Sequence, residues 1–116
     1  MIPKIRTPSL EYKVTLKGKN VIKKPNPGFG FKVKTDAMKL KNLGDLAPKT
    51  RYDEKRNVLV QEAVHGRFAT EKEVSKVAKM VEKKGYRSRG MLPHDVIVTP
   101  KGKYKVIDVG NFERIY

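Results

Sequence analysis

The segment from Thr70 to Gly85 constrains the fold of this chain more than any other stretch. It opens with TEKE, a capping box in which the Thr70 hydroxyl and the Glu73 carboxylate satisfy free amides of the first helical turn. Apolar residues then recur at helical spacing, and two lysines precede the glycine at which the helix is expected to end. The pattern predicts an amphipathic helix over about 71–84, with an inward face of Val74, Val77, Ala78 and Val81.

Short segments with strand character lie on both sides of this helix. Two apolar runs near the carboxyl end are joined by the turn Pro100–Lys103 and predict a hairpin. The predicted strands are Glu11–Leu16, Val21–Lys24, Phe29–Val33, Val58–Val60, Val96–Thr99 and Tyr104–Val109.

The remaining segments are expected to form one short helix, turns and loops. Thr35 or Asp36 is expected to cap the helix, which runs to about Leu43 and ends at Gly44. We expect turns or loops at Tyr52–Asn57, Tyr86–His94 and Asn111–Glu113.

This order of elements predicts an α+β fold, with a small antiparallel sheet, hairpins and one well-defined helix. The length of 116 residues suits a single domain over 1–116. Within it, residues 1–50 form a basic, strand-rich part, and residues 51–116 contain the helix and the carboxyl-terminal hairpin.

The charge is strongly positive. The chain has 27 Lys and Arg against 12 Asp and Glu, a formal charge of +15, of which residues 1–50 contribute +9. Such a field attracts polyanions, so we expect a nucleotide or nucleic acid as partner. There are no cysteines, no apolar run approaches the ~20 residues of a membrane span, and the start MIPKIRTPSL lacks a signal-peptide core. We therefore expect a cytoplasmic protein with no membrane span.

Two aspartates border the predicted hairpin. Asp95 lies just before its first strand, and Asp108 lies among apolar residues of the second. A carboxylate in apolar surroundings is costly unless it is bonded or binds a metal. Oxygen ligands suit Mg²⁺, which usually takes one or two carboxylates and completes its shell with phosphates. The pair predicts a magnesium site, although aspartate also favours turns for its own sake.

The segments RYDEKRNVLVQEAVHGR and GYRSRGMLPHDVIVTPKGKYKVIDVG resemble the hinge, catalytic loop and metal-binding turn of protein-kinase-like domains, over residues 52–116. The resemblance implies ATP and Mg²⁺ as cofactors. It places Asp108 on the metal-binding aspartate of the Asp-Phe-Gly turn and Asp95 on the second metal ligand. It also implies that Glu62 and Val64 present backbone groups to adenine, and that Lys23, in the tripeptide VIK, contacts phosphates.

The chain departs from that family pattern in several places. Ser88 and Gly90 stand where the catalytic-loop histidine and aspartate are expected, so His94 is the nearest candidate for the group that accepts a proton. No glycine-rich loop precedes Lys23, and no helix glutamate is evident to pair with it. The resemblance therefore implies a minimal or degenerate member, a phosphotransferase or a pseudokinase.

Two other readings remain open. The chain is also typical of a small basic nucleic-acid-binding protein or ribonuclease-type toxin, with Glu62, His65 and His94 as acid–base candidates. A phage or mobile-element interaction module with a protein partner is the other reading. The predicted contacts to nucleic acid are Lys13, Lys17, Lys19, Lys23, Lys24, Arg87 and Arg89.

Overall fold

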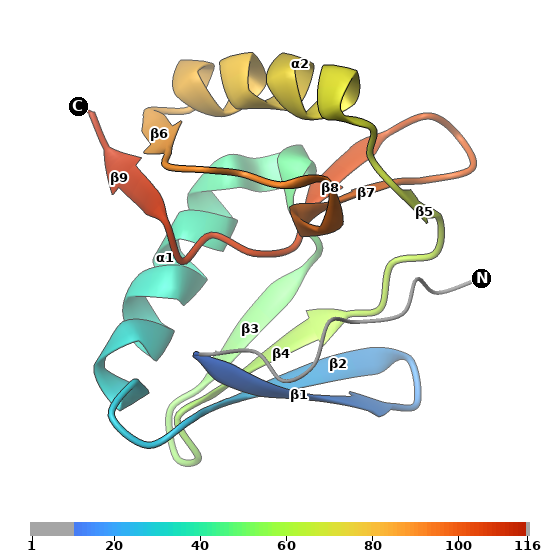
Figure 1. The fold of residues 1–116 in the computed structure, drawn as a ribbon. Helices are drawn as coiled ribbons and strands as arrows, with labels where there is room; N and C mark the ends of the chain where they lie inside the picture. The colour runs from blue at the N-terminus through green and yellow to red at the C-terminus, as the bar shows by residue number, and fades with distance from the viewer. Residues whose placement is uncertain (1–10, 116) are drawn as a thin grey trace.

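A computed structural model of the protein describes residues 11–115. The start MIPKIRTPSL, for which we expect no signal peptide, lies outside the described residues. Within residues 11–115, short strands form three antiparallel sheets, and two α-helices pack beside them (Figure 1). The predicted α+β class is confirmed.

The largest sheet has four strands in the order β1-β2-β4-β3. Three of them correspond to predicted strands, but β3 was not predicted, because Tyr52 and Asp53 looked like part of a polar turn. Asn57 makes that turn tighter than the sequence suggests, since it adopts a left-handed φ of 53°. The strands are β1 (Tyr12–Lys17), β2 (Asn20–Pro25), β3 (Thr50–Asp53) and β4 (Val58–Glu62).

The first helix begins earlier than its sequence predicts. The strand expected at Phe29–Val33 is wrong: a 3-10 turn, η1 (Gly30–Lys32), leads directly into α1 (Val33–Leu43). The reason is that Phe31 is 78% exposed, so this segment has no buried alternating face, whereas Val33 belongs to the apolar face of the helix. Neither expected capping residue is the N-cap, which is Lys32 without a side-chain bond.

The predicted end of α1 at Gly44 is confirmed. Gly44 has a φ of 57°, a conformation that glycine adopts without a steric penalty. A second 3-10 turn, η2 (Gly44–Leu46), follows and buries Leu46.

The second helix, α2 (Glu71–Lys83), forms as predicted. The Glu73 amide donates to the Thr70 hydroxyl at 3.2 Å, and the Thr70 amide donates to the Glu73 carboxylate at 2.9 Å, which completes the capping box. Arg67 adds a bidentate contact to the same carboxylate, at 2.7 and 3.0 Å. This bond and the backbone amide bond lower the pKa of Glu73 to about 2.

The carboxyl-terminal third contains the predicted hairpin, but its second strand ends at Val106, so Asp108 lies in the turn that follows. The predicted loop from Tyr86 and the predicted turn around Phe112 are partly wrong, because these two segments pair as strands. The strands are β5 (Arg67–Phe68), β6 (Tyr86–Ser88), β7 (Val96–Val98), β8 (Tyr104–Val106) and β9 (Phe112–Arg114).

One apolar cluster joins the two halves of the described chain. Residues of both helices and of the sheets contribute to it, including Val33 and Leu43 of α1, Val77 of α2 and Val96 of β7. α1 packs on β3, and α2 packs on β6 (Figure 1). Neither helix within residues 11–115 has the length and apolar character needed to cross a bilayer.

Candidate functional site

Lys23 lies on β2 and belongs to the inward face of the four-stranded sheet. It pairs with Val14 of β1 and Leu59 of β4 in the strand register. Its ammonium group donates a hydrogen bond to the main-chain carbonyl of Ile107, the residue before Asp108. The fold thus joins two segments that are 84 positions apart in the sequence.

Burial lowers the pKa of Lys23, because a charged ammonium loses its hydration there. The carboxylates of Asp108, then Asp36 and Asp95, act in the opposite direction. The Lys23 ammonium group is therefore poorly hydrated, and the nearby carboxylates favour its charged form.

Asp108 follows β8, and its side chain is exposed although the next residue, Val109, is buried. Its Oδ1 accepts a hydrogen bond from the Gly110 amide at 3.0 Å. The expectation of an aspartate buried among apolar strand residues is therefore wrong, because the strand ends two residues earlier. The side chain instead has access to solvent, where a metal ion or ligand can reach it.

Asp95 closes a short 3-10 turn, η3 (Pro93–Asp95), directly before β7. Its Oδ2 accepts a hydrogen bond from the Leu92 amide at 2.8 Å, and its carbonyl accepts one from the Ile107 amide at 2.8 Å. Burial raises the pKa of Asp95, and the negative charge of Asp108 raises it further. A cation at the two carboxylates would relieve this repulsion.

His94 lies beside these groups, with Nε2 3.6 Å from Asp95 Oδ1. A cavity of about 190 Å³ brings together His94, Asp95 and Asp108. Its lining includes neither Glu62 nor His65, the other two acid–base candidates of the ribonuclease reading. The full lining is Gly90, Met91, Leu92, His94, Asp95, Asp108, Asn111 and Phe112.

The cavity is smaller than the roughly 300 Å³ at which ligand pockets usually begin. It has room for a metal ion and the phosphate end of a nucleotide, whereas the base would need another surface. Residues 11–115 contain no cluster of three or more histidine and carboxylate side chains placed for a metal. A Mg²⁺ ion at the two aspartates would take its other ligands from phosphate and water.

The predicted adenine-binding segment follows β4. The Glu62 amide donates to the carbonyl of Lys49 at 2.9 Å, so this group already has a partner. Val64 is half-buried, and its backbone forms no hydrogen bond with the other described residues. Of the two predicted positions, Val64 is the one whose amide has no partner among the described residues.

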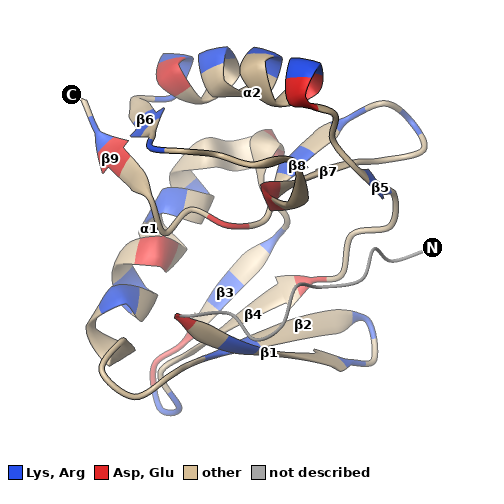
Figure 2. Ribbon diagram, in the orientation of Figure 1, with Lys and Arg blue, Asp and Glu red and all other residues tan. Residues whose placement is uncertain are grey.

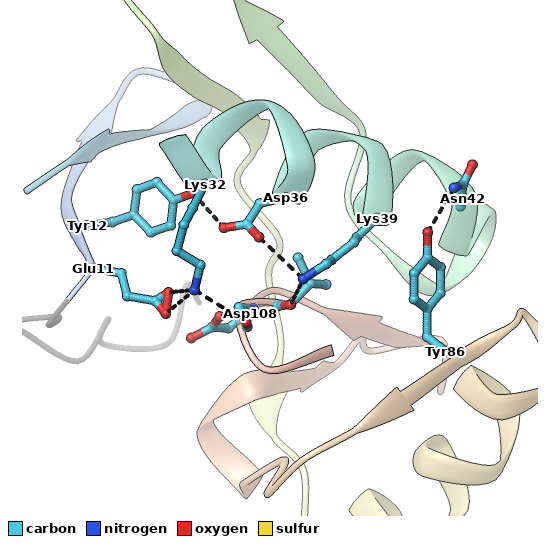
Figure 3. Close-up of polar contacts among 10 residues, drawn as sticks. Glu11, Tyr12, Lys32, Asp36, Lys39, Asn42, Tyr86 and Asp108 are labelled. Carbon is cyan, nitrogen blue, oxygen red and sulfur yellow. Dashed lines mark hydrogen bonds and ion pairs between the residues drawn. The ribbon is translucent and has the colours of Figure 1, made fainter. Parts of the chain in front are cut away.

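Asp36 of α1 is a buried site residue that we did not identify from the sequence. It is 2% exposed and accepts a hydrogen bond from the Tyr12 hydroxyl at 2.6 Å (Figure 3). Burial raises the pKa of Asp36, although the bond from Tyr12 and the charge of Lys39 act against the increase. The same burial, together with this bond, raises the pKa of Tyr12. The spacing of Val33 and Leu40 was the available signal, since it puts Asp36 on the inward face.

Four of the predicted nucleic-acid contacts lie on the β1–β2 hairpin and are exposed (Figure 2). Lys13 pairs with Lys24 across the two strands, and their neighbour Lys23 points to the opposite face of the sheet. The hairpin positions are Lys13, Lys17, Lys19 and Lys24.

The two arginines of the predicted set lie elsewhere, on and after β6. Arg87 is exposed, and Arg89 forms an ion pair with Glu113 at 2.8 Å. This pair occupies the guanidinium group that was expected to contact phosphate.

No protein-family model and no curated protein sequence matches the chain. Solved structures match its fold. A crystal structure of WbdD is 18% identical and aligns 94% of this chain with 32% of that one, at a TM-score of 0.60. A co-crystal structure of WbdD and the kinase inhibitor LY294002 is 15% identical, with 91% and 32% coverage and a TM-score of 0.55.

The chain spans about a third of the length of these WbdD structures. At such identities the similarity establishes a shared fold and nothing about activity.

Proposed function

We propose that this chain is a kinase-like domain that binds ATP together with Mg²⁺. The observation that carries the proposal is the contact between Lys23 and the carbonyl of Ile107, directly before Asp108. The contact brings Lys23 within electrostatic range of Asp108 and Asp95. Both aspartates line the cavity with His94, whereas Lys23 is not part of that lining.

Each residue then has a distinct role. Asp95 and Asp108 would hold the metal, Lys23 would contact phosphate oxygens, and the backbone of Val64 would meet the adenine edge. When bound, Mg²⁺ neutralises phosphate charge and orients the nucleotide. The repulsion between the two aspartates supports a cation at this position.

Phosphate transfer would need a group that accepts the proton of the substrate hydroxyl. Gly90 supplies no side chain at the position where the resemblance places that group. His94 lines the cavity and lies 3.6 Å from Asp95, so it is the proposed acceptor if transfer occurs. We propose nucleotide binding as the primary function and place transfer second to it.

The comparison with WbdD supports the proposal at the level of the fold. One of the two similar structures contains a kinase inhibitor, so a ligand of that class binds within that protein.

Thermal unfolding with ATP, with and without Mg²⁺, tests the proposal. A ligand at about 100 times its Kd stabilises the folded state by about 2.7 kcal/mol. The wild type should show this stabilisation with the metal and a much smaller one without it, and Asp108→Asn should remove the metal-dependent part. Asp45→Asn, at an exposed aspartate of η2, is the matched control and should respond like the wild type. A wild type that ATP and Mg²⁺ do not stabilise would reject the function.

One specific observation favours a second candidate, binding of single-stranded nucleic acid on the hairpin. Lys13 and Lys24 lie directly opposite each other, an arrangement that is unfavourable until an anion lies between them. Binding of a fluorescent RNA oligomer should weaken with salt, and Lys24→Gln should reduce the slope of log K against log salt by about 1. Lys34→Gln on α1 is the control, and equal slopes in all three proteins would exclude the hairpin as the binding surface.

A further inference from the structure

Three lysine ammonium groups surround the turn that carries Asp108. Figure 3 shows two of them, Lys32 and Lys39. They come from three separate elements, and each one donates a hydrogen bond to a different main-chain carbonyl of the turn. The pairs are Lys23 with Ile107, Lys39 with Val109 at 3.4 Å, and Lys32 with Gly110 at 3.3 Å.

Lys32, at the end of η1, connects the turn to the start of β1. Its ammonium contacts both carboxylate oxygens of Glu11, at 2.6 and 2.8 Å, as well as the Gly110 carbonyl. The Glu11 carboxylate lies so close to Gly110 that a Cβ there would be 2.6 Å from Oε2. The turn is therefore packed tightly against this ion pair.

Lys39 connects the same turn to the buried carboxylate of α1. Its ammonium lies 3.8 Å from Asp36 Oδ1, and its side chain is only 14% exposed. Asp36 Oδ1 has no hydrogen-bond partner within the described residues, so this ion pair is its main compensation. The Val109 carbonyl also accepts a hydrogen bond from the Phe112 amide, and this bond closes the turn. Lys39 therefore contacts the acceptor of the turn-closing hydrogen bond.

We propose that Lys32 and Lys39 are positioning residues that hold the Asp108 turn in the geometry that binds Mg²⁺. This inference rests on the proposed nucleotide and metal function. The two lysines bind carbonyls and leave the Asp108 carboxylate with one described hydrogen bond, from the Gly110 amide. The two lysines would thus orient the Asp108 carboxylate without forming an ion pair with it. Residues in the outer shell of metal sites orient metal ligands in this way.

The test compares ATP affinity with Mg²⁺ and with EDTA in Lys32→Met and Lys39→Met. Loss of an orienting contact should weaken Mg²⁺·ATP binding about tenfold, the lower end for outer partners of metal ligands. ATP affinity in EDTA should change less than about twofold, because the metal site is not then used. Lys39→Arg should recover most of the affinity, and Lys34→Met, at an exposed lysine of α1, should match the wild type.

Hydrogen exchange of the ligand-free protein measures the turn itself. The Gly110 and Phe112 amides, which bond within the turn, should exchange several-fold faster in Lys39→Met than in Lys34→Met. Lys39→Met leaves Asp36 without its ion-pair partner. If that variant does not fold, the pair Asp36→Asn and Asp36→Asn/Lys39→Met provides the same comparison without the buried charge.

Unchanged Mg²⁺·ATP affinity in both methionine variants would overturn the inference, and so would unchanged exchange. Equal losses with and without metal would also overturn it, since they indicate only a general attraction for phosphate. A wild type without Mg²⁺-dependent binding would reject the proposed function itself. The wild-type titration alone distinguishes that failure from the others.

Discussion

Both helices of this protein bury three apolar residues, but they differ in their caps and in their buried polar contacts. The buried residues of α2 are Val74, Val77 and Val81, and its start is capped by its own sequence. α1 has no side-chain cap and buries Asp36 among its apolar residues. The difference shows that the start of α2 is specified by neighbouring residues, whereas α1 adds polar contacts with β1 and with the Asp108 turn to its apolar packing. The start of α1 and its buried Asp36 were not predicted from the sequence, and such departures from local sequence rules are expected near functional sites.

The largest expected effect on stability comes from placing a carboxylate on the buried face of α2, as α1 has with Asp36. Val77 is fully buried within the apolar cluster, whereas Asp36 has the Tyr12 hydroxyl and Lys39 beside it. Val77→Asp should therefore cost more than about 4 kcal/mol of unfolding free energy. Ser75→Asp, on the exposed face of α2, should change it by less than about 0.5 kcal/mol. Urea denaturation measures both, and a stable Val77→Asp protein would contradict the apolar burial of this face.

The second prediction concerns the polar residue of α1. Asp36→Asn keeps an acceptor for the Tyr12 hydroxyl but removes the charge that faces Lys39. It should cost about 1 kcal/mol near pH 4, where the raised pKa keeps Asp36 mainly protonated, because the substitution disturbs the buried hydrogen bond with Tyr12.

The pH dependence of that cost has a definite sign. Burial raises the pKa of Asp36, so the folded protein binds a proton that the unfolded chain has released. The wild type then loses stability as the pH rises above about 3.9, the value for an unfolded aspartate, through the raised folded-state pKa. Asparagine does not titrate, so the deficit of Asp36→Asn should shrink as the pH rises. A deficit that grows with pH, measured by urea denaturation, would show that the ionised form is the stabilised one.

The third prediction compares the two helix starts with the same substitution. Thr70→Ala removes the hydroxyl of the capping box and should cost about 1 kcal/mol. Thr35→Ala, at a position that sequence alone suggested as a cap, should change stability by less than about 0.5 kcal/mol because Thr35 lies inside α1. Thermal unfolding of both variants measures the difference, and a larger loss at Thr35 would restore the original assignment.

Local signals in the sequence were enough for α2, the β1–β2 hairpin and β7–β8. The Thr70 capping box and the valine spacing are contained within one element, so no distant contact can easily override them. β6 and β9 were missed because neither has an alternating pattern of its own. They are defined by pairing Ser88 with Phe112, and no short window of sequence reveals such a pairing.

The residues of the candidate site also fall into those that the sequence could predict and those that it could not. Asp95 and Asp108 are close in sequence and on either side of one hairpin, so their proximity was predictable. Lys23 was placed only by resemblance. Its ammonium group contacts the Ile107 carbonyl, and its contact with phosphate stays a prediction. Lys32 and Lys39 escaped notice, since lysine is common in this chain and only the packing of α1 against the turn distinguishes them.

Replacement of Mg²⁺ by paramagnetic Mn²⁺ tests the central claim most directly. With ATP present, the amide signals of Asp95 and Asp108 should broaden first, and those of Lys17 and Lys19 at the hairpin tip should stay sharp. In Asp108→Asn the broadening should be lost. Broadening at the hairpin tip, or none at Asp95 and Asp108, would contradict a metal and nucleotide site at this turn.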